Sequence, residues 1–549
     1  MIEVREVGQR VDGGRRTLRD VSLSIGAGEL VAIIGGSGSG KTTLLDAIAG
    51  VRPPAEGEVR YDGASGSLGY VPQDDIVHKD LPLRRTLLYA AGLRLPAGTA
   101  PADAERAVDG VLDDLALTGR AGQRVGSLSG GERKRASIAV ELLTRPRVFF
   151  LDEPTSGLDP ASAADLMRLL RGLADAGTTV VMTTHHPPDV GVCDRVAVLA
   201  PDGRLAFYGS PDEALEEFGA GAVDDIYLRL AGVASPGWED RFRRSGGTGP
   251  AAGSRIGAVR QWTLLTRRNL DLLTRNRLTL AVLAGSPVMV LAMFAVLFRP
   301  GAFAPESPSP GATVMILFWI AFGGFFFGLT YGLLQICTEL PVLRRERLTG
   351  LRIGPYVLAK AAVLLPLLAV VDALMLGVLR GLDRLPAMGW ATYGELFVTL
   401  LLCSVAALAL GLLVSAAVTD PAQATMALPM LCFPQVLFVG AILPVPVMAA
   451  PGRWLSYAMS NRWAFEGLGH SLGVERLWGS GRSPLGPPLL ASYGGTFSRA
   501  VAADWAVLAG FAALFLAGTA AVLARRTRTS PGFPPRPADR TSPNSDAPS

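Results

Sequence analysis

The chain has 549 residues, too many for one ordinary domain, and 49% of them are hydrophobic, a high share for a soluble protein. A net charge of +4 is too small to indicate nucleic acid, so no such partner is expected. Four cysteines without metal-ligand spacing indicate neither a zinc site nor a disulfide framework. The first ten residues hold no apolar run, so we expect no cleaved signal peptide and a cytosolic N-terminal domain.

Residues 1–233 are predicted to form an α/β domain. Short, continuous apolar segments alternate with segments of helical periodicity, which is typical of a mostly parallel sheet covered on both faces. The strands are expected at 29–35, 148–153 and 178–185, and the helices at 42–50 and 161–177.

A glycine-rich segment follows the first of these strands and precedes the first helix, and it fits the P-loop pattern of nucleoside triphosphatases. Its glycines let backbone N–H groups approach phosphate, Lys41 neutralises phosphate oxygens, and the Thr42 hydroxyl is a ligand for Mg²⁺. The residues predicted to bind the nucleotide here are Gly35, Gly36, Ser37, Gly38, Ser39, Gly40, Lys41, Thr42 and Thr43.

Two acids, Asp152 and Glu153, end the apolar strand VFFL. The first is placed to hold Mg²⁺ and the second to polarise an attacking water. On spacing alone, a pair of acids that simply ends a strand is the alternative.

Four further motifs resemble those of ABC transporter ATPases, in the order and spacing of that family. They are LSGGE (128–132) for the signature motif, VPQ (71–73) for the Q-loop, SGLD (156–159) for the D-loop, and TTHH (183–186) for the switch histidine. The chain therefore resembles this family, whose ATPase domains bind ATP and Mg²⁺ and transfer the γ-phosphoryl group to water.

The resemblance implies a role for each matching residue. Glu153 is the implied catalytic base, His185 contacts the γ-phosphate, and Gln73 senses Mg²⁺ and the membrane domain. The signature residues are implied to contact the nucleotide of a partner subunit; with the D-loop acid, this set is Ser129, Gly130, Gly131 and Asp159. By register, the neighbouring His186 is expected to be a bystander.

Two departures from the family pattern stand out. The signature motif ends in Glu132, where many families have Gln, and the aromatic residue expected near Val11 to stack on adenine is missing. The preference for ATP over GTP therefore rests on the resemblance.

Other segments resemble the G subfamily of half-transporters. The ATPase part comes first, ERKR (132–135) follows the signature glycines, and three longer segments match in character, at 70–96, 344–360 and 437–468. The resemblance implies an ATPase domain fused to a type-2 permease domain, working as a dimer, most simply a homodimer. The whole chain is expected to be an α/β P-loop NTPase domain followed by an all-α, six-helix transmembrane domain.

Residues 234–254 are rich in Gly, Ser and Pro and are predicted to be a flexible linker. Residues 255–276 are predicted to form an amphipathic connecting helix, with Val259, Trp262 and Leu265 on one face. Such a helix suits the membrane surface; packing on the ATPase domain is the alternative.

The transmembrane domain is predicted at 277–528, with a disordered tail at 529–549. The basic segment 344–360 is expected in the cytosol, which puts both termini there. Nearly all basic residues are Arg, which indicates a high-GC bacterium, so the expected location is the bacterial plasma membrane. The six spans are expected at about 278–298, 312–336, 357–379, 395–417, 424–446 and 502–524.

Aromatic residues concentrate in the second and fifth predicted spans, which line a central cavity in G-type transporters. Phe318, Phe322, Phe325 and Phe433 would form an apolar slot for a flat or lipid-like substrate. Packing or lipid-facing roles are the alternative.

The leading hypothesis is an ATP-driven transporter that exports a hydrophobic compound or lipid. A membrane ATPase that drives or signals to an envelope partner without transport is the alternative, and a P-loop kinase fused to a membrane anchor is a remote third. Fusion in one chain favours export, by analogy only.

Overall fold

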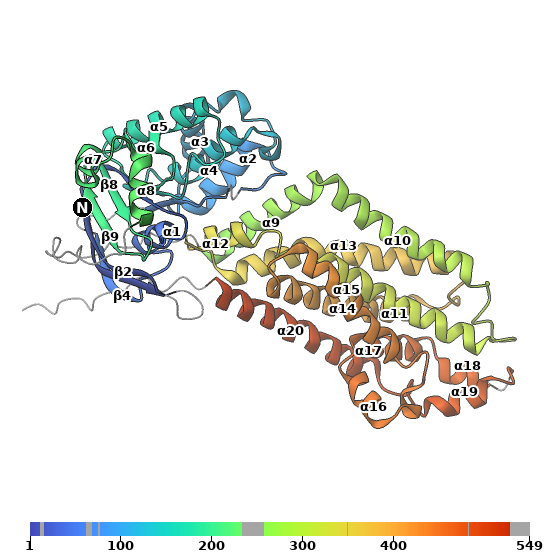
Figure 1. Cartoon of the computed structure of the whole chain (residues 1–549). Coiled ribbons are helices and arrows are strands. Elements are labelled where there is room, and N and C mark those ends of the chain that lie inside the picture. The colour runs from blue at the N-terminus through green and yellow to red at the C-terminus, as the bar shows by residue number, and fades with distance from the viewer. Residues whose placement is uncertain are drawn as a thin grey trace, which may run out of the picture.

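The computed structural model describes residues 1–10, 16–61, 68–74, 77–232, 257–348, 350–480 and 482–527. The predicted linker, the predicted tail and Val11 lie outside these residues. An N-terminal α/β domain and a C-terminal helical domain lie end to end (Figure 1). The predicted fold class is therefore confirmed.

The larger sheet of the α/β domain has the strand order β5-β6-β7-β3-β8-β9. Its first five strands pair in parallel, and only β9 is antiparallel to its neighbour. The strands are β3 (Leu30–Gly35), β5 (Leu68–Val71), β6 (Val148–Leu151), β7 (Thr179–Thr183), β8 (Arg195–Leu199) and β9 (Leu205–Gly209).

Alternate residues of β3 face two different hydrophobic cores. Leu30, Ala32 and Ile34 pack toward one core, whereas Val31 and Ile33 pack toward the other. Because successive side chains of a strand point to opposite faces, a strand covered on both faces must be apolar throughout. The helices of this domain are α1 (Lys41–Ile48), α2 (Leu83–Arg94), α3 (Pro101–Asp114), α4 (Gly130–Leu142), α5 (Pro160–Asp175), α6 (Pro187–Val190), α7 (Pro211–Phe218) and α8 (Val223–Gly232).

A second sheet, not predicted in full from the sequence, has the antiparallel order β2-β1-β4. It contributes Ile2, Val4 and Val7 to the core that also holds Val31 and α1. Its strands are β1 (Ile2–Arg10), β2 (Arg16–Ile25) and β4 (Glu56–Tyr61).

The helical domain has a helix at each of the six predicted spans. Within the described residues, four are long and apolar enough to cross a membrane. They are α11 (Pro310–Leu333), α13 (Ile353–Gly381), α14 (Trp390–Ala417) and α20 (Val501–Arg526). The other two are α10 (Arg277–Leu297) and α15 (Pro421–Leu437).

The fifth predicted span differs from the observed helix. It was expected to end at residue 446, but α15 has 17 residues and ends at Leu437. Gly440 adopts a positive φ of 98°, and Pro444 follows, so the chain turns instead of continuing the helix.

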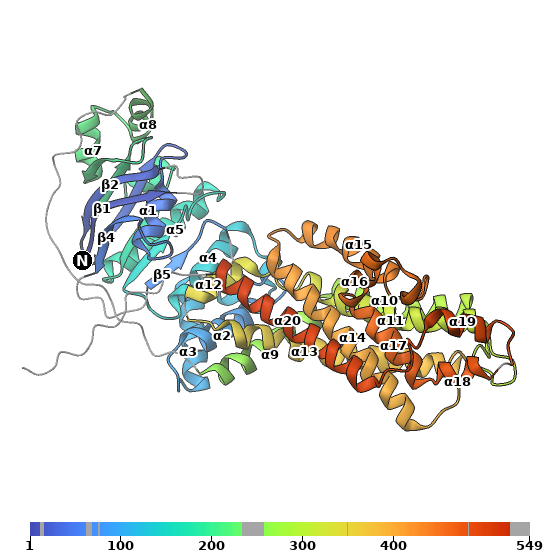
Figure 2. The ribbon, with the colours of Figure 1, turned by 90° about the horizontal axis from the view of Figure 1, so that it is seen from below.

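Short helices fill the segment between α15 and α20. Figures 1 and 2 place α18 and α19 at the end of the bundle far from the α/β domain. The four are α16 (Ala450–Tyr457), α17 (Ser460–Ser471), α18 (Val474–Gly479) and α19 (Gly486–Tyr493).

Two helices connect the domains. Helix α9 (Ala258–Arg275) packs along α13, and its Asp271 accepts a hydrogen bond of 2.6 Å from Tyr89 of α2. Helix α12 (Leu340–Leu348) follows α11. The predicted amphipathic helix thus lies between the α/β domain and the bundle, and Val259 and Trp262 remain exposed.

Candidate active site

The glycine-rich loop runs from the end of β3 to the start of α1, and its shape requires glycine at both ends. Gly35 and Gly40 have positive φ values of 150° and 99°. A Cβ atom on Gly35 would lie 2.5 Å from the carbonyl oxygen of Leu199, and one on Gly40 would lie 2.8 Å from that of Thr17. No other residue fits these positions without shifting the backbone. The loop therefore presents the N-terminus of α1 to an anion.

The ammonium group of Lys41 lies over this loop. It donates hydrogen bonds of 2.9 Å and 3.2 Å to the carbonyl oxygens of Gly35 and Gly36. Burial lowers the pKa of Lys41, and the nearby Glu153 and Asp152 oppose that shift. Within the described residues, the buried hydroxyl of Ser39 has no hydrogen-bond partner. The ammonium group of Lys41 and the unpaired hydroxyl of Ser39 can therefore both hydrogen-bond to a phosphate group.

Asp152 is held at the end of β6 by two hydroxyl groups. Its Oδ1 accepts hydrogen bonds from Thr42 Oγ1 at 3.0 Å and from Thr183 Oγ1 at 2.6 Å. A hydroxyl of α1 and a buried carboxylate therefore meet beside the phosphate loop. Such hard oxygen donors, completed by phosphate oxygens, fit Mg²⁺.

Glu153 lies next to Asp152 at the edge of the site. Its Oε2 accepts a hydrogen bond of 3.0 Å from Gln73 Nε2, and its Oε1 lies 3.4 Å from His185 Nδ1. Its backbone has φ 44°, a costly conformation outside glycine, and its N–H is fixed by Thr183 Oγ1 at 2.9 Å. Three residues predicted from separate motifs are thus brought together at one carboxylate.

The neighbouring His186 lies in a different network. Its Nδ1 is 3.1 Å from Asp189 Oδ1, while Asp189 Oδ2 accepts hydrogen bonds from Thr155 and Thr184. This network fixes the turn after β7 at the position of His185.

Among the described residues, the signature residues form hydrogen bonds within their own helix ends and not with the phosphate loop. Ser129 caps α4 in a capping box with Glu132, and Asp159 caps α5 by accepting a hydrogen bond of 3.0 Å from the N–H of Ser162. Ser129, Gly130 and Asp159 are exposed. They form an open surface of the subunit.

Lys134 is a site-supporting residue that sequence reasoning missed. It is buried in α4, and its Nζ donates hydrogen bonds of 2.8 Å and 3.3 Å to the carbonyl oxygens of Gln73 and Pro72. The one available signal was its place in ERKR as one of only four lysines. It ties the signature helix to the Q-loop.

A buried ion-pair cluster joins the α/β domain to the bundle. Arg345 of α12 donates hydrogen bonds to Glu141 Oε1 at 2.7 Å and to the carbonyl oxygen of Ser137 at 2.6 Å. Arg94 of α2 donates to the same carboxylate at 2.9 Å. The helix that begins at the signature motif thus contacts the membrane domain directly.

The four predicted substrate residues fall into two groups. Phe318 and Phe325 are 3% and 0% exposed and belong to the core of the bundle. Phe322, on the same helix, is partly exposed and stacks on Phe318 with ring centroids 5.9 Å apart. Phe433 on α15 is 65% exposed. Of the four, only Phe322 and Phe433 have side chains that are accessible in a single subunit.

Comparisons with known proteins agree with this geometry. Residues 18–156 match the family described as ABC transporter, and residues 260–472 match the family described as ABC-2 type transporter. An ABC transporter ATP-binding/permease protein of Mycobacterium tuberculosis is 34% identical over 84% of this chain and 56% of its own length. The chain therefore has an ABC ATPase domain followed by an ABC-2 type membrane domain.

Its relatives include G-type transporters. ABC transporter G family member 26 of Arabidopsis thaliana is 39% identical over 38% of this chain and 32% of its own length. A broad substrate specificity ATP-binding cassette transporter of Bos taurus is 39% identical over 35% of this chain and 31% of its own length. A solved ATP-binding subunit of an ABC transporter is 26% identical, with a TM-score of 0.37, over 42% of this chain and 99% of that one. The chain spans from about a third to about half of the length of these curated relatives.

Proposed function

We propose that this protein is an ATP-driven transporter that acts as a dimer in the bacterial plasma membrane and exports a hydrophobic compound or lipid. The observation that carries the proposal is the meeting of Gln73, Asp152, Glu153 and His185 beside the phosphate loop, on a domain joined to a membrane bundle by Arg345. The ATPase domain and both termini would lie in the cytosol.

The hydrolytic step follows from these positions. Mg²⁺, when bound, neutralises charge on the phosphate oxygens, and Thr42 and Asp152 are the residues that would hold it. Glu153 would orient and polarise the attacking water, while His185 and Gln73 would fix the carboxylate and contact the γ-phosphate region. Catalysis would thus come from positioning and charge stabilisation.

Two exposed surfaces support action as a dimer. Ser129 and Gly130 are open to solvent instead of contacting the phosphate loop of their own subunit. They are therefore available to the nucleotide of a second subunit, as the family resemblance implies. In the bundle, α15 exposes Met426, Met430 and Phe433. A second membrane domain would cover this apolar face.

The ion pair between Arg345 and Glu141 supplies a route for coupling. Both side chains are about 95% buried, so α4 and α12 are expected to move together. ATP-driven closure of two ATPase domains would then displace α12 and the spans next to it. This requires ATP to bind the two conformations with different affinity.

The substrate class is proposed from the aromatic residues. Phe322 and Phe433 would face a cavity between two membrane domains, where a flat or lipid-like molecule packs favourably on aromatic rings. The name of the bovine relative describes broad specificity, which agrees with a site built from apolar contacts.

Glu153→Gln tests the proposal in vesicles of purified protein that contain a fluorescent hydrophobic probe. We expect ATP binding to persist while phosphate release and probe movement fall by about a hundredfold or more, since a general base contributes roughly 10²–10⁴-fold. Glu216→Gln, at an exposed position, is the matched control. Probe movement that continues in Glu153→Gln would rule out this mechanism.

A further inference from the structure

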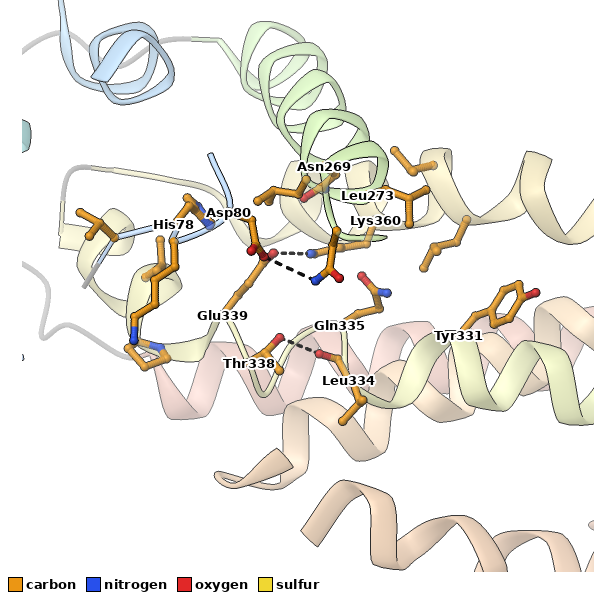
Figure 3. A pocket seen from close by; sticks show the side chains of 18 of the residues that line it. His78, Asp80, Asn269, Leu273, Tyr331, Leu334, Gln335, Thr338, Glu339 and Lys360 are labelled. Atoms are coloured by element: carbon orange, nitrogen blue, oxygen red, sulfur yellow. Dashed lines mark hydrogen bonds and ion pairs between the residues drawn. The ribbon is translucent and has the colours of Figure 1, made fainter. Parts of the chain in front are cut away.

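A cavity of about 760 Å³ lies where the two domains meet. Its walls come from Asp74 and residues 77–80, which follow the Q-loop, from α9, from the end of α11 and the turn after it, from α12 and from the first half of α13 (Figure 3). None of the ATP-site residues named above is among the described residues that line it.

Three polar side chains among the residues that line these walls carry buried atoms without a hydrogen-bond partner. Asn269 of α9 is 6% exposed, and both its Nδ2 and Oδ1 lack a hydrogen-bond partner among the described residues. The same holds for Thr330 Oγ1 at the end of α11 and for His78 Nε2. Buried polar groups are rarely left unpaired, so these atoms have hydrogen-bonding capacity that a water or a ligand can satisfy.

Three of the charged groups on the walls have partners there. Lys360 Nζ lies 2.8 Å from Glu339 Oε1, and Asp80 Oδ2 accepts a hydrogen bond of 3.5 Å from Asn276. Burial lowers the pKa of His78 to about 4, so this ring is neutral at pH 7. The walls hold three acids, Asp74, Asp80 and Glu339, and two lysines, Lys79 and Lys360, so they offer no excess of positive charge for an anion.

The part of the cavity next to the spans is apolar. Leu273, Leu334, Val363 and Leu364 line it; Leu334 directly follows α11, and Val363 and Leu364 lie within α13. The volume is within the range of about 300–1,000 Å³ that is usual for ligand pockets. It greatly exceeds the roughly 30 Å³ of one water. The cavity thus has a polar side toward the ATPase domain and an apolar side toward the membrane.

We propose that this cavity binds an uncharged amphiphile with a hydroxyl-rich head, of the chemical class of glycolipids in the cytosolic leaflet. The head hydrogen-bonds to His78, Asn269 and Thr330, and the apolar part lies along Leu273 and Val363. Because the walls belong to both domains, the bound molecule bridges them. The proposal is independent of the direction of transport.

A photoreactive octyl glucoside tests the site on the full chain in phosphatidylcholine nanodiscs, with labelled peptides located by mass spectrometry. We expect saturable labelling of α9, of residues near the end of α11 and of residues 360–364 in α13. Glucosyl diacylglycerol should compete for it, whereas glucose and phosphatidylglycerol should not. Competition by glucose alone would show a free-sugar site, and equal competition by phosphatidylglycerol would show an anion site. Either result, or no saturable labelling, overturns the proposal.

Substitutions assign the labelling to the cavity. Thr330→Val and Asn269→Leu should each weaken labelling by about five- to tenfold, as the loss of one or two neutral hydrogen bonds predicts. Thr263→Val, on the exposed side of α9, is the matched control. Val363→Phe adds apolar volume inside the cavity and should also reduce labelling, even if Asn269→Leu does not fold. Unchanged labelling in Thr330→Val and Val363→Phe overturns the assignment.

Discussion

The guanidinium of Arg345 donates a hydrogen bond of 2.7 Å to the carboxylate of Glu141, which lies 204 residues earlier in the chain. Burial raises the pKa of Glu141, but the attraction of Arg94 and Arg345 outweighs burial, so its pKa lies below the usual value. The carboxylate therefore stays ionised inside the protein. One charged cluster thus joins α2, α4 and α12.

Removal of one arginine should disturb both stability and coupling. In Arg345→Met, Glu141 keeps only Arg94, and we expect a loss of about 1–3 kcal/mol in the free energy of unfolding. ATP hydrolysis should continue while probe transport falls. Thermal unfolding and parallel ATPase and transport assays measure this. Arg344→Met, at the exposed neighbouring position, should resemble the unmodified protein. Equal behaviour of the two variants would contradict a role in coupling.

Lys134 should matter for turnover more than for ATP binding. Lys134→Met removes the hydrogen bonds that hold the carbonyl oxygens of Pro72 and Gln73, so the Gln73 side chain loses its fixed position near Glu153. We expect kcat to fall by about ten- to a hundredfold, the usual effect of a misplaced active-site group. Binding of a fluorescent ATP analogue should change little. Arg168→Met, at an exposed position of α5, is the control. A full loss of ATP binding in Lys134→Met would contradict the prediction.

Thr183 should act through the predicted metal site. Thr183→Val keeps the shape of the side chain but removes the hydroxyl that donates to Asp152 and accepts from the N–H of Glu153. Loss of such a supporting group typically weakens metal binding by about 10–100-fold. Activity should therefore require more Mg²⁺, as a titration of ATPase rate against Mg²⁺ would measure. Thr178→Val, just before the same strand, should titrate like the unmodified protein.

His78 should make stability depend on pH. Its pKa in the folded chain, about 4, lies below the ordinary value of 6.5 because of burial and the nearby Arg268. The unfolded chain therefore binds a proton more readily between these values. The contribution of neutral His78 to the free energy of unfolding is fully present above about pH 6.5 and is lost as the pH falls toward 4. His78→Gln should flatten the fall of the unfolding midpoint between pH 6.5 and 5.

Strands β3, β6 and β7, helices α1 and α5 and the helical spans could be predicted from local patterns, but the sheet β2-β1-β4 and some helix ends could not. Helix α15 ends at Leu437 because the backbone turns at Gly440, a conformation that hydropathy does not report. The buried state of Phe318 and Phe325 also escaped prediction, because an aromatic residue in an apolar run has the same pattern whether it faces core, lipid or ligand.

The sequence by itself determined the chemistry of the phosphate loop, because Gly35 to Thr42 act within one strand–loop–helix unit at fixed spacing. It also determined the class of protein, through motifs in a set order. Only the tertiary structure decided which distant groups support them: Thr183 on Asp152, Lys134 on Gln73, and Arg345 on Glu141. These pairs depend on how strands and helices pack across the fold, and a hydrogen bond between residues 31 to 204 positions apart leaves no periodic signal in the chain.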